Sequence, residues 1–449
     1  MACTVFDSRL FRDMFGTAPM RDIFSDEAYL ARCVEVEVAL ARAQAAVGLF
    51  PAAHAEAIAA GARAERLDLE ALRQETEIVG YPILPLVRQL NALCGDSGRY
   101  LHWGATTQDI MDTATVLQCA QGVAQIGRQL DAVREALRTL TRRHADTVTA
   151  GRTHLQHALP ITFGYRTAVW LSALNRHAER LEQAADRALM VEFGGAAGTL
   201  ASLGEPHAAL AVRARLAEEL GLRDAPITWH VARDGLCELV SVLAAIGASL
   251  GKIALDVMLM AAGEFGEVAE PFVHGRGASS TMPQKRNPIS SELIFAAAKM
   301  LRERAALMLD AMLQDFERAT GPWHLEWSAI PESFLLASSA LAQADFMLRG
   351  LEVDAARMRD NLDLSGGLIV AEAVMMGLAP ALGRQRAHDV VYEACRLAID
   401  SRRGLYAVLS EDAEIVAALG DARLRRLTDP AQYLGAAAQM AHAVADAVR

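Results

Sequence analysis

The chain has 449 residues, of which 52% are apolar and only 6% aromatic, and its formal net charge is −11. This composition favours helices over sheets, and the negative charge is not that of a general nucleic-acid binder. The first residues lack the apolar segment of a secretory signal, and the six cysteines show neither zinc-site nor disulfide-framework spacing. We therefore expect a cytoplasmic protein in a reducing compartment.

Helical periodicity extends through nearly the whole sequence. Residues 1–104 carry short helical patterns, and the clearest long helix follows them. Its apolar positions alternate in steps of three and four residues: Val116, Cys119, Val123, Ile126, Leu130, Val133, Leu137 and Leu140. This heptad pattern predicts a helix that packs lengthwise against near-parallel neighbours. Further long helices are expected over residues 163–191, 236–265 and 289–316.

Together these patterns predict an all-α protein of three domains. We expect an N-terminal helical domain over residues 1–104, a central bundle of long helices over 105–351, and a C-terminal helical domain over 352–449. Alternation typical of strands is weak, so extended segments are expected at most near residues 147–155 and 226–231.

The helix expected over residues 236–265 is apolar on nearly every side. Lys252 and Asp256 interrupt it, so it lacks the uninterrupted apolar run of a membrane span. We interpret it as a fully buried core helix and expect no membrane partner. Because one chain does not readily supply enough neighbours for such a helix, we also expect a homo-oligomer.

The loop before the last long helix reads Gly277-Ala278-Ser279-Ser280-Thr281-Met282-Pro283-Gln284-Lys285-Arg286-Asn287-Pro288. Gly and Pro set the backbone of such loops, and the helix that follows presents N–H groups and a dipole that favour an anion. Lys285 adds a full positive charge. The segment therefore predicts a carboxylate site with a serine beside it, although a rigid capped turn is the simpler interpretation.

Two earlier loops also carry candidate ligands. In His102–Thr113, a T-T-Q-D cluster forms either an N-cap or a set of uncharged donors for a carboxylate. In Gly151–Pro160, His154 and His157 lie three residues apart without a third metal ligand nearby, so no metal is expected. A loop imidazole near neutral pKa suits proton transfer.

The three loops resemble the motifs of the fumarase/aspartase superfamily. The run from Gly277 is similar to G-S-S-x-M-P-x-K-x-N-P, with Ala278 in place of a usual glycine or other small residue. The run from His102 is similar to H-x-G-x-T-S-x-D, with Thr107 at the serine position, and G-R-T-H-L-Q matches the second motif. The resemblance implies the superfamily's fold, a homotetramer whose active sites each draw on three subunits, and no cofactor.

The resemblance also implies roles for individual residues. Ser279 takes the position of the catalytic base, and His154 that of the histidine that transfers a proton. The implied substrate-binding residues are Thr106, Thr107, Gln108, Thr153, Gln156, Lys285, Asn287 and Arg318. For Arg318 a structural role fits equally well, and Arg233-Asp234 fits either a buried ion pair or a substrate contact.

Most of the chain, including Met20–Asp26 and Phe193–Leu200, is similar to bacterial 3-carboxy-cis,cis-muconate cycloisomerases, but two positions depart from them. Those enzymes typically carry Trp where this chain has His154, and His where it has Gln284. A proton-transferring His is instead the pattern of lyases that expel a nitrogen or oxygen leaving group. Adenylosuccinate lyases share it but have a further histidine where this chain reads Gly80–Pro85.

We therefore predict a lyase acting on a small dicarboxylate or tricarboxylate. The leading hypothesis is a β-elimination that releases fumarate from a small N-substituted aspartate, for example iminodisuccinate, through Cβ proton abstraction and an aci-carboxylate intermediate. The alternatives are a lactonising 3-carboxy-cis,cis-muconate cycloisomerase and an adenylosuccinate lyase-like enzyme. A catalytically inactive structural relative is a further alternative, against which the intact Ser279, His154 and Lys285 argue.

Overall fold

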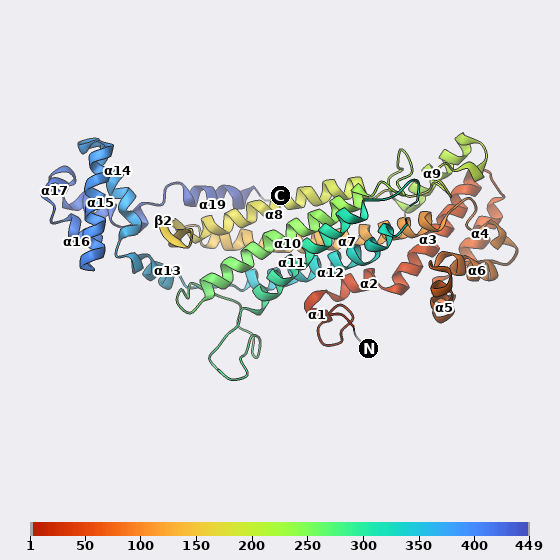
Figure 1. The fold of residues 1–449 in the computed structure, drawn as a ribbon, viewed down its shortest axis with the longest axis horizontal. Helices are drawn as coiled ribbons and strands as arrows, with labels where there is room; N and C mark the ends of the chain where they lie inside the picture. Colours follow the sequence, from red (N-terminus) through yellow and green to blue (C-terminus); the bar gives the residue numbers. More distant parts are fainter. Residues whose placement is uncertain (1–2, 319, 448–449) are drawn as a thin grey trace. The chain divides into compact units, whose positions relative to one another are not determined.

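The computed structural model describes residues 3–318 and 320–447 and confirms the all-α class. Its five long helices are shown in Figure 1: α7 Thr107–Arg143, α8 Phe163–Ala188, α10 Asp234–Ala261, α11 Ile289–Ala311 and α12 Pro322–Arg349. The first four were predicted, and α12 was not. In α7 seven of the eight seam residues are buried, and Val123 is half-buried, as expected for a helix packed lengthwise.

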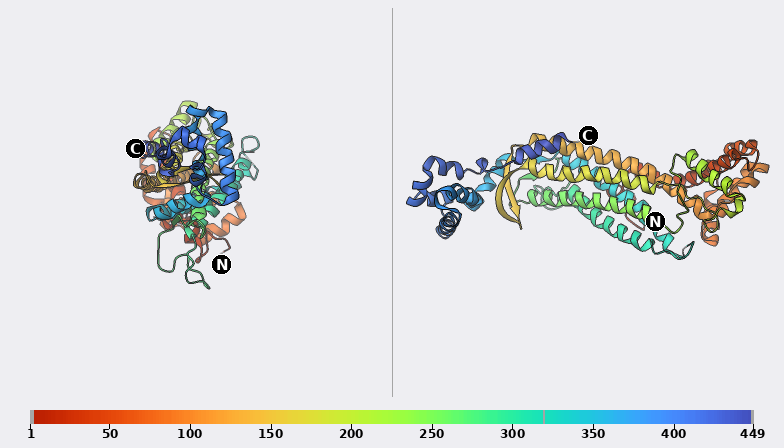
Figure 2. Two further views of the ribbon diagram at one scale, coloured as in Figure 1. Left: turned by 90° about the vertical axis from the view of Figure 1, so that its left-hand side faces the viewer. Right: turned by 90° about the horizontal axis from the view of Figure 1, so that it is seen from above.

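The described residues group into two compact units. The first contains the chain up to Gln129, His177–Ala248 and Ala296–Ala342, and the second contains Leu130–Arg176, Ser249–Phe295 and the chain from Gln343 onward. Within each unit the segments of the long helices lie side by side in the views of Figures 1 and 2. The division into three domains at residues 104/105 and 351/352 stays a prediction.

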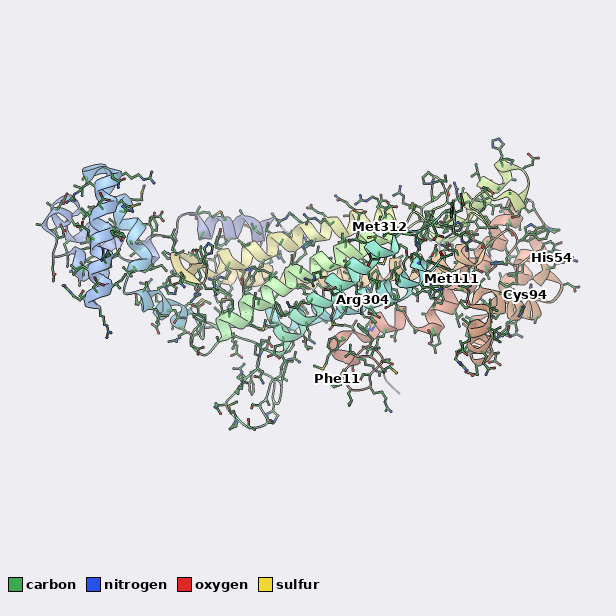
Figure 3. The ribbon with its side chains drawn as sticks, viewed as in Figure 1. Phe11, His54, Cys94, Met111, Arg304 and Met312 are labelled. Atoms are coloured by element: carbon green, nitrogen blue, oxygen red, sulfur yellow. The ribbon has the colours of Figure 1, made fainter. Side chains whose placement is uncertain are left out.

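The first unit packs its shorter helices around a continuous apolar core. Ser25 caps α3 by accepting a hydrogen bond from the Ala28 N–H at 3.2 Å. Leu40, Ile58 and Leu86 are buried in this core, Met111 of α7 joins it, and Cys94 packs at its edge (Figure 3). The remaining helices of this unit are α1 Arg12–Phe15, α2 Ala18–Ile23, α3 Asp26–Ala46, α4 Ala52–Gly61, η1 Ala64–Arg66, α5 Leu69–Val79, α6 Ile83–Cys94, η2 Gly95–Tyr100, η3 Ala201–Leu203 and α9 Pro206–Leu220.

The second unit adds the strands and the C-terminal helices. β1 Val148–Thr153 and β2 Gln156–Thr162 form an antiparallel hairpin, and β3 Val268–Ala269 pairs with β4 Glu352–Val353. Its other helices are α13 Ala355–Leu362, η4 Asp363–Ser365, η5 Leu368–Val370, α14 Ala371–Leu382, α15 Arg384–Ser401, α16 Leu405–Leu409, α17 Ala413–Leu419, α18 Asp421–Leu427, η6 Pro430–Gln432 and α19 Ala437–Asp446. The extended segment expected near residues 147–155 is confirmed as β1, whereas residues 226–231 form no strand.

Within this chain alone, the apolar helix is not fully buried. In α10 half of the most apolar window is buried within this chain, and Leu255 and Leu259 are each 41% exposed. Within the described residues α10 is the one single helix long and apolar enough to cross a membrane, a property that core helices of soluble proteins share. A second candidate exists only if the pair 355–365 and 368–382, bent by 84°, is counted as one span.

Candidate active site

His154 lies at the tip of the β1–β2 hairpin. His154 and Leu155 form its two-residue turn, and their φ angles are +52° and +62°. A turn with two positive φ angles normally uses Asn or Gly, because larger side chains are strained in the left-handed region. Strain of this kind persists where the surrounding structure enforces it and is concentrated at functional sites. The turn leaves the His154 side chain exposed, with Thr153 and Gln156 paired directly behind it.

A buried ion pair anchors the hairpin. Arg152 donates two hydrogen bonds to the Glu267 carboxylate, at 3.0 and 2.5 Å, and Glu267 is fully buried. Asn361 donates a further hydrogen bond to the same carboxylate at 2.9 Å. Bidentate guanidinium–carboxylate pairs fix orientation as well as adding energy, so this contact holds the base of the strained turn.

The predicted serine loop projects from the ends of α10 and α11 (Figure 1) and is closed at its base. The Asn287 N–H donates to the Gly277 carbonyl at 2.9 Å, and Ala278 forms an antiparallel bridge with Arg286. Gly277 has φ +68°, and a Cβ there would lie 2.4 Å from the Asn287 oxygen. Any side chain at position 277 would clash here, which explains physically why the motif begins with glycine.

Within the loop, Ser279 receives backbone hydrogen bonds on its side-chain oxygen. The N–H groups of Met282 and Thr281 donate to Oγ at 3.0 and 3.3 Å, and the Thr281 hydroxyl lies 3.5 Å away. Donors aimed at a hydroxyl oxygen favour its ionised form. The Lys285 side chain is exposed, and within the described part of the chain its ammonium makes no ion pair. Asn287 is half-buried at the loop base.

The predicted anion site at the N-terminus of α11 needs a correction. Glu270 already occupies it: its carboxylate accepts hydrogen bonds from the backbone N–H groups of Ser290 and Ser291 at 3.0 and 2.7 Å, and from the Ser291 hydroxyl at 2.7 Å. The free donors of the helix are therefore satisfied by a carboxylate of the same chain. Glu270 does not bond the Lys285 or Asn287 side chains of the loop itself.

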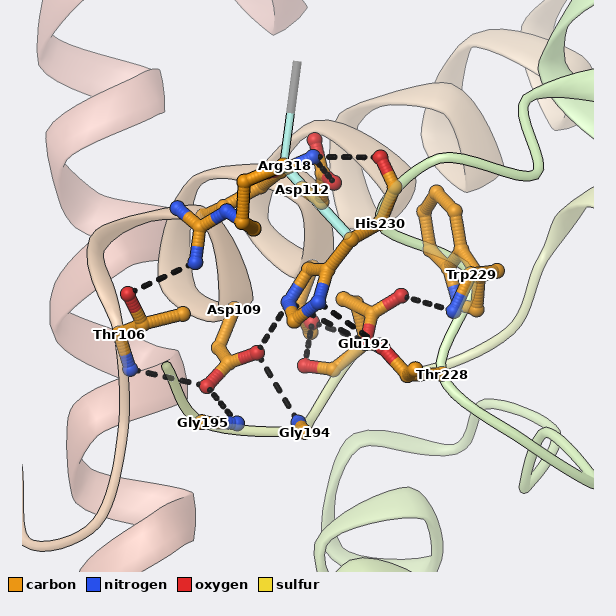
Figure 4. Close-up of polar contacts among 12 residues, drawn as sticks. Thr106, Asp109, Asp112, Glu192, Gly194, Gly195, Thr228, Trp229, His230 and Arg318 are labelled. Carbon is orange, nitrogen blue, oxygen red and sulfur yellow. Dashed lines mark hydrogen bonds and ion pairs between the residues drawn. The ribbon is translucent and has the colours of Figure 1, made fainter. Parts of the chain in front are cut away.

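In the first unit, the structure brings Thr106 and Arg318 together. Arg318 Nη1 donates to the Thr106 hydroxyl at 2.9 Å, and both side chains are half-buried (Figure 4). A guanidinium and a hydroxyl side by side suit a carboxylate ligand. Thr107, which follows Thr106 in the sequence and is the first residue of α7, is also half-buried.

Gln108 does not fit the predicted role. Its side-chain amide nitrogen donates to Asp112 Oδ2 at 3.0 Å and to the His230 carbonyl at 2.9 Å, and the residue is buried. Both N–H groups are therefore used inside the protein, and none is left for a substrate carboxylate. Gln108 therefore links α7 to the His230 backbone inside the protein and is not available for substrate binding.

Arg233 forms a buried ion pair, one of the two roles expected for it, but not with its neighbour Asp234. Its guanidinium bonds the Asp112 carboxylate at 2.6 and 3.0 Å and the Glu326 carboxylate at 2.8 and 2.5 Å. The indole of Trp323 donates to Asp112 at 2.9 Å. Burial raises the pKa of Glu326 in spite of this cation.

The sequence analysis missed the buried cluster formed by Asp109, Glu192 and His230. Asp109 accepts hydrogen bonds from three backbone N–H groups and lies 2.7 Å from His230 Nε2 (Figure 4). Thr228 bonds both Glu192 Oε1, at 2.6 Å, and His230 Nδ1, at 2.9 Å. Burial raises the pKa of Glu192 to about 7. Asp109 ends the run that resembles H-x-G-x-T-S-x-D, but no spacing in the sequence linked it to Glu192 or His230.

The predicted site residues thus fall into two groups. Ser279, His154, Thr153, Gln156, Lys285 and Asn287 belong to the second unit, whereas Thr106, Thr107, Gln108 and Arg318 belong to the first. Among the described residues, no hydrogen bond joins Ser279 to His154. The convergence of all these residues in one site stays a prediction.

Two family models match the chain. One, described as a lyase, matches residues 15–301, and the other, described as the adenylosuccinate lyase C-terminus, matches residues 367–444. Together they cover most of the two units, including all three loops in which the predicted site residues cluster.

Several known proteins are similar over almost the full length. The crystal structure of a fumarate lyase from Mesorhizobium sp. BNC1 has 56% identity and a TM-score of 0.91, covering 97% of this chain and 99% of that one. A 3-carboxy-cis,cis-muconate cycloisomerase of Pseudomonas aeruginosa is 48% identical, over 96% of this chain and 94% of its own. A nitrosuccinate lyase of Streptomyces davaonensis is 44% identical, over 96% and 93%.

Proposed function

Because this chain belongs to the fumarase/aspartase superfamily of lyases, we propose that it releases fumarate from a small N-substituted aspartate, such as iminodisuccinate, by β-elimination. The observation that carries the proposal is the Ser279 hydroxyl, whose oxygen accepts hydrogen bonds from two backbone N–H groups in a loop that also presents the exposed Lys285 ammonium. The 56% identical relative described as a fumarate lyase supports the product.

Ser279 acts as the base in this proposal. A free serine hydroxyl is a poor base, and the N–H groups of Met282 and Thr281 stabilise the alkoxide that accepts the Cβ proton. The electron pair of the broken C–H bond moves into the neighbouring carboxylate, which becomes a doubly charged aci-carboxylate. Lys285 and Asn287 stabilise that charge, because preorganised donors are most effective where charge develops.

His154 assists the second half of the reaction. The electron pair returns to form the carbon–carbon double bond of fumarate as the Cα–N bond breaks, and the departing amine takes a proton from the imidazolium form of His154, which becomes the neutral imidazole. The strained, exposed turn at the tip of β1–β2 presents this side chain away from its own hairpin. Thr106, Thr107 and Arg318 hold the substrate carboxylates, with Thr153 and Gln156 flanking the histidine.

The site is assembled from different subunits of a homotetramer. The exposed apolar side chains of α10, Leu255 and Leu259, support such an assembly, because a helix of this composition is stable when further apolar surface covers it.

The second candidate is the cycloisomerase, which the 48% identity to the Pseudomonas aeruginosa enzyme favours. His154 and Gln284 argue against it, because both residues depart from the cycloisomerase pattern and a proton-transferring His is the pattern of lyases that expel a nitrogen or oxygen leaving group. The adenylosuccinate lyase-like alternative is favoured by the match to residues 367–444. It is weakened by Tyr81, which stacks on Trp323 in the segment where those enzymes carry a histidine.

The test is a comparison of substrates. Purified enzyme is incubated with a panel of N-substituted aspartates, with adenylosuccinate, and with 3-carboxy-cis,cis-muconate, and the ultraviolet absorbance of fumarate and of the muconate is followed. We expect fumarate from at least one small aspartate adduct and no loss of the muconate. Consumption of the muconate, with no fumarate from any adduct, would refute the proposal in favour of the cycloisomerase.

A further inference from the structure

The Asp109 carboxylate is fully occupied by hydrogen-bond donors. Oδ1 accepts from the Gly194 N–H at 3.0 Å and faces His230 Nε2 at 2.7 Å, and Oδ2 accepts from the N–H groups of Gly195 and Thr106 at 3.0 and 2.9 Å. A carboxylate offers four lone-pair positions, and here all four are used. No position is left for a proton on Asp109 or for a metal ion, so the contact with His230 requires a hydrogen on Nε2.

On the Nδ1 side of the His230 ring, the contacts with Thr228 and Glu192 allow two arrangements of the protons, and both keep a hydrogen on Nε2. If Glu192 is ionised, the Thr228 hydroxyl donates to it and His230 Nδ1–H donates to Thr228. If Glu192 holds the proton, it donates to Thr228, which then donates to Nδ1. In both states Nε2 carries a hydrogen that points to Asp109. The Thr228 hydroxyl therefore lets a proton move between His230 and Glu192 without disturbing the bond to Asp109.

The four donors come from three separate segments of the first unit. Thr106 precedes α7, Gly194 and Gly195 follow α8, and His230 lies in the loop before α10. Asp109 and His230 are each 1% exposed. The loop that ends at Thr106 is thus fixed at its last residue by a carboxylate whose orientation depends on the histidine.

We propose that His230 is a positioning residue for the substrate: through Asp109 it fixes the backbone of Thr106, and so the Thr106–Arg318 pair that receives a substrate carboxylate. This inference rests on the proposed function for the identity of the ligand, but its geometry is independent of it. His230 does not touch the substrate, and its effect on the reaction is exerted through binding. Loss of its Nε2–H therefore weakens substrate binding and leaves the proton-transfer groups in place.

Two substitutions separate the two sides of the ring. In His230→Gln the side-chain amide nitrogen replaces Nε2–H and still reaches Asp109, whereas in His230→Asn the amide replaces only Nδ1–H. We expect the Asn variant to raise KM about tenfold or more, the effect of losing one hydrogen bond to a charged group, with little change in kcat. The Gln variant restores KM. His207→Asn, an exposed histidine of α9, is the matched control.

Hydrogen–deuterium exchange measured by mass spectrometry provides a readout without substrate. In the Asn variant, peptides that contain Thr106 and the Gly194–Gly195 pair are expected to exchange about tenfold faster than in the wild type, and in the Gln variant at the wild-type rate. Equal exchange and equal KM in all variants would overturn the inference. If no aspartate adduct is turned over by any variant, the proposed function fails, but the exchange comparison still decides the role of His230.

A measurement on the wild type remains decisive if the Asn variant does not fold. Solid-state NMR of the sedimented, ¹⁵N-histidine-labelled protein reports whether Nε2 carries a hydrogen, and the resonance that disappears in His230→Gln assigns the residue. We expect a protonated Nε2. An Nε2 without hydrogen contradicts the proposed donor to Asp109.

Discussion

Arg318 Nη1 donates a hydrogen bond to the hydroxyl of Thr106 at 2.9 Å, although the two residues lie 212 positions apart in the chain. Arg318 follows α11 and Thr106 precedes α7, so the folding of the first unit creates this pair. A guanidinium held beside a hydroxyl, both half-buried, offers a carboxylate one charged and one neutral donor. We therefore expect both residues to contribute to the binding of a substrate carboxylate.

Replacing Thr106 by Val or Arg318 by Gln should weaken substrate binding. We expect each change to raise KM about tenfold, because each removes one donor to a charged group, while kcat falls less. In the double variant, the loss of binding free energy should be smaller than the sum of the losses in the two single variants, since the two residues share one ligand. Steady-state kinetics with the best aspartate adduct measure this, and Arg302→Gln is the control, because Arg302 is exposed on α11. Unchanged KM values in both single variants would remove the pair from the site.

Ser279 and Ser280 form a matched pair for testing the base. Ser279→Ala should lower kcat by about a thousandfold or more, because the substitution removes the proposed base. Ser280→Ala should keep the rate, since its side chain is exposed and accepts none of the loop N–H groups that bond Ser279. Thermal melting should be nearly unchanged in both variants. Equal rates in the two variants would exclude Ser279 as the base.

His154→Phe should slow the elimination in a way that depends on the leaving group. Removing a general acid typically costs a factor of about 10²–10⁴. For adducts of weakly basic amines, which leave without a proton, the loss should be much smaller. The measurement is a plot of log kcat against the pKa of the amine, which should be steeper for the variant. Parallel plots would show that His154 does not protonate the amine.

Glu192 makes stability depend on pH. Burial raises its pKa in the folded state to about 7, above the ordinary 4.5, so the folded protein binds the extra proton between these values. The stabilisation linked to this proton is present below about pH 4.5 and is lost as pH rises toward 7. A shift of this size corresponds to about 3 kcal/mol.

The comparison that isolates this effect uses Glu192→Gln, whose side chain is neutral at every pH. Urea unfolding of the wild type relative to this variant should show a declining difference in free energy as pH rises from about 4.5 to 7. Glu205→Gln, at an exposed position, serves as the control for the loss of a carboxylate as such. A flat difference for Glu192→Gln would indicate that the carboxylate is ionised in the folded protein throughout this range.

Local sequence features were sufficient for four of the five long helices and for the loop that begins at Gly277. The three- and four-residue steps of α7 identified its buried seam, because a helix repeats the same face along the chain. The Gly277 and Ser279 positions were also predictable, since the positive φ of the first and the hydroxyl of the second are properties of single residues. The fold class and the superfamily followed from these patterns, and the substrate remains a proposal.

The tertiary structure alone decided which polar groups are paired. Nothing in the spacing of residues indicated that Glu270 would occupy the start of α11, that Gln108 would bond the His230 carbonyl, or that Arg233 would pair with Asp112 and Glu326 instead of Asp234. Burial selects these partners, because a charge removed from water must find a counter-charge among whatever segments the fold brings beside it. Periodicity along a chain carries information about its faces, but none about which distant carboxylate will meet a given cation.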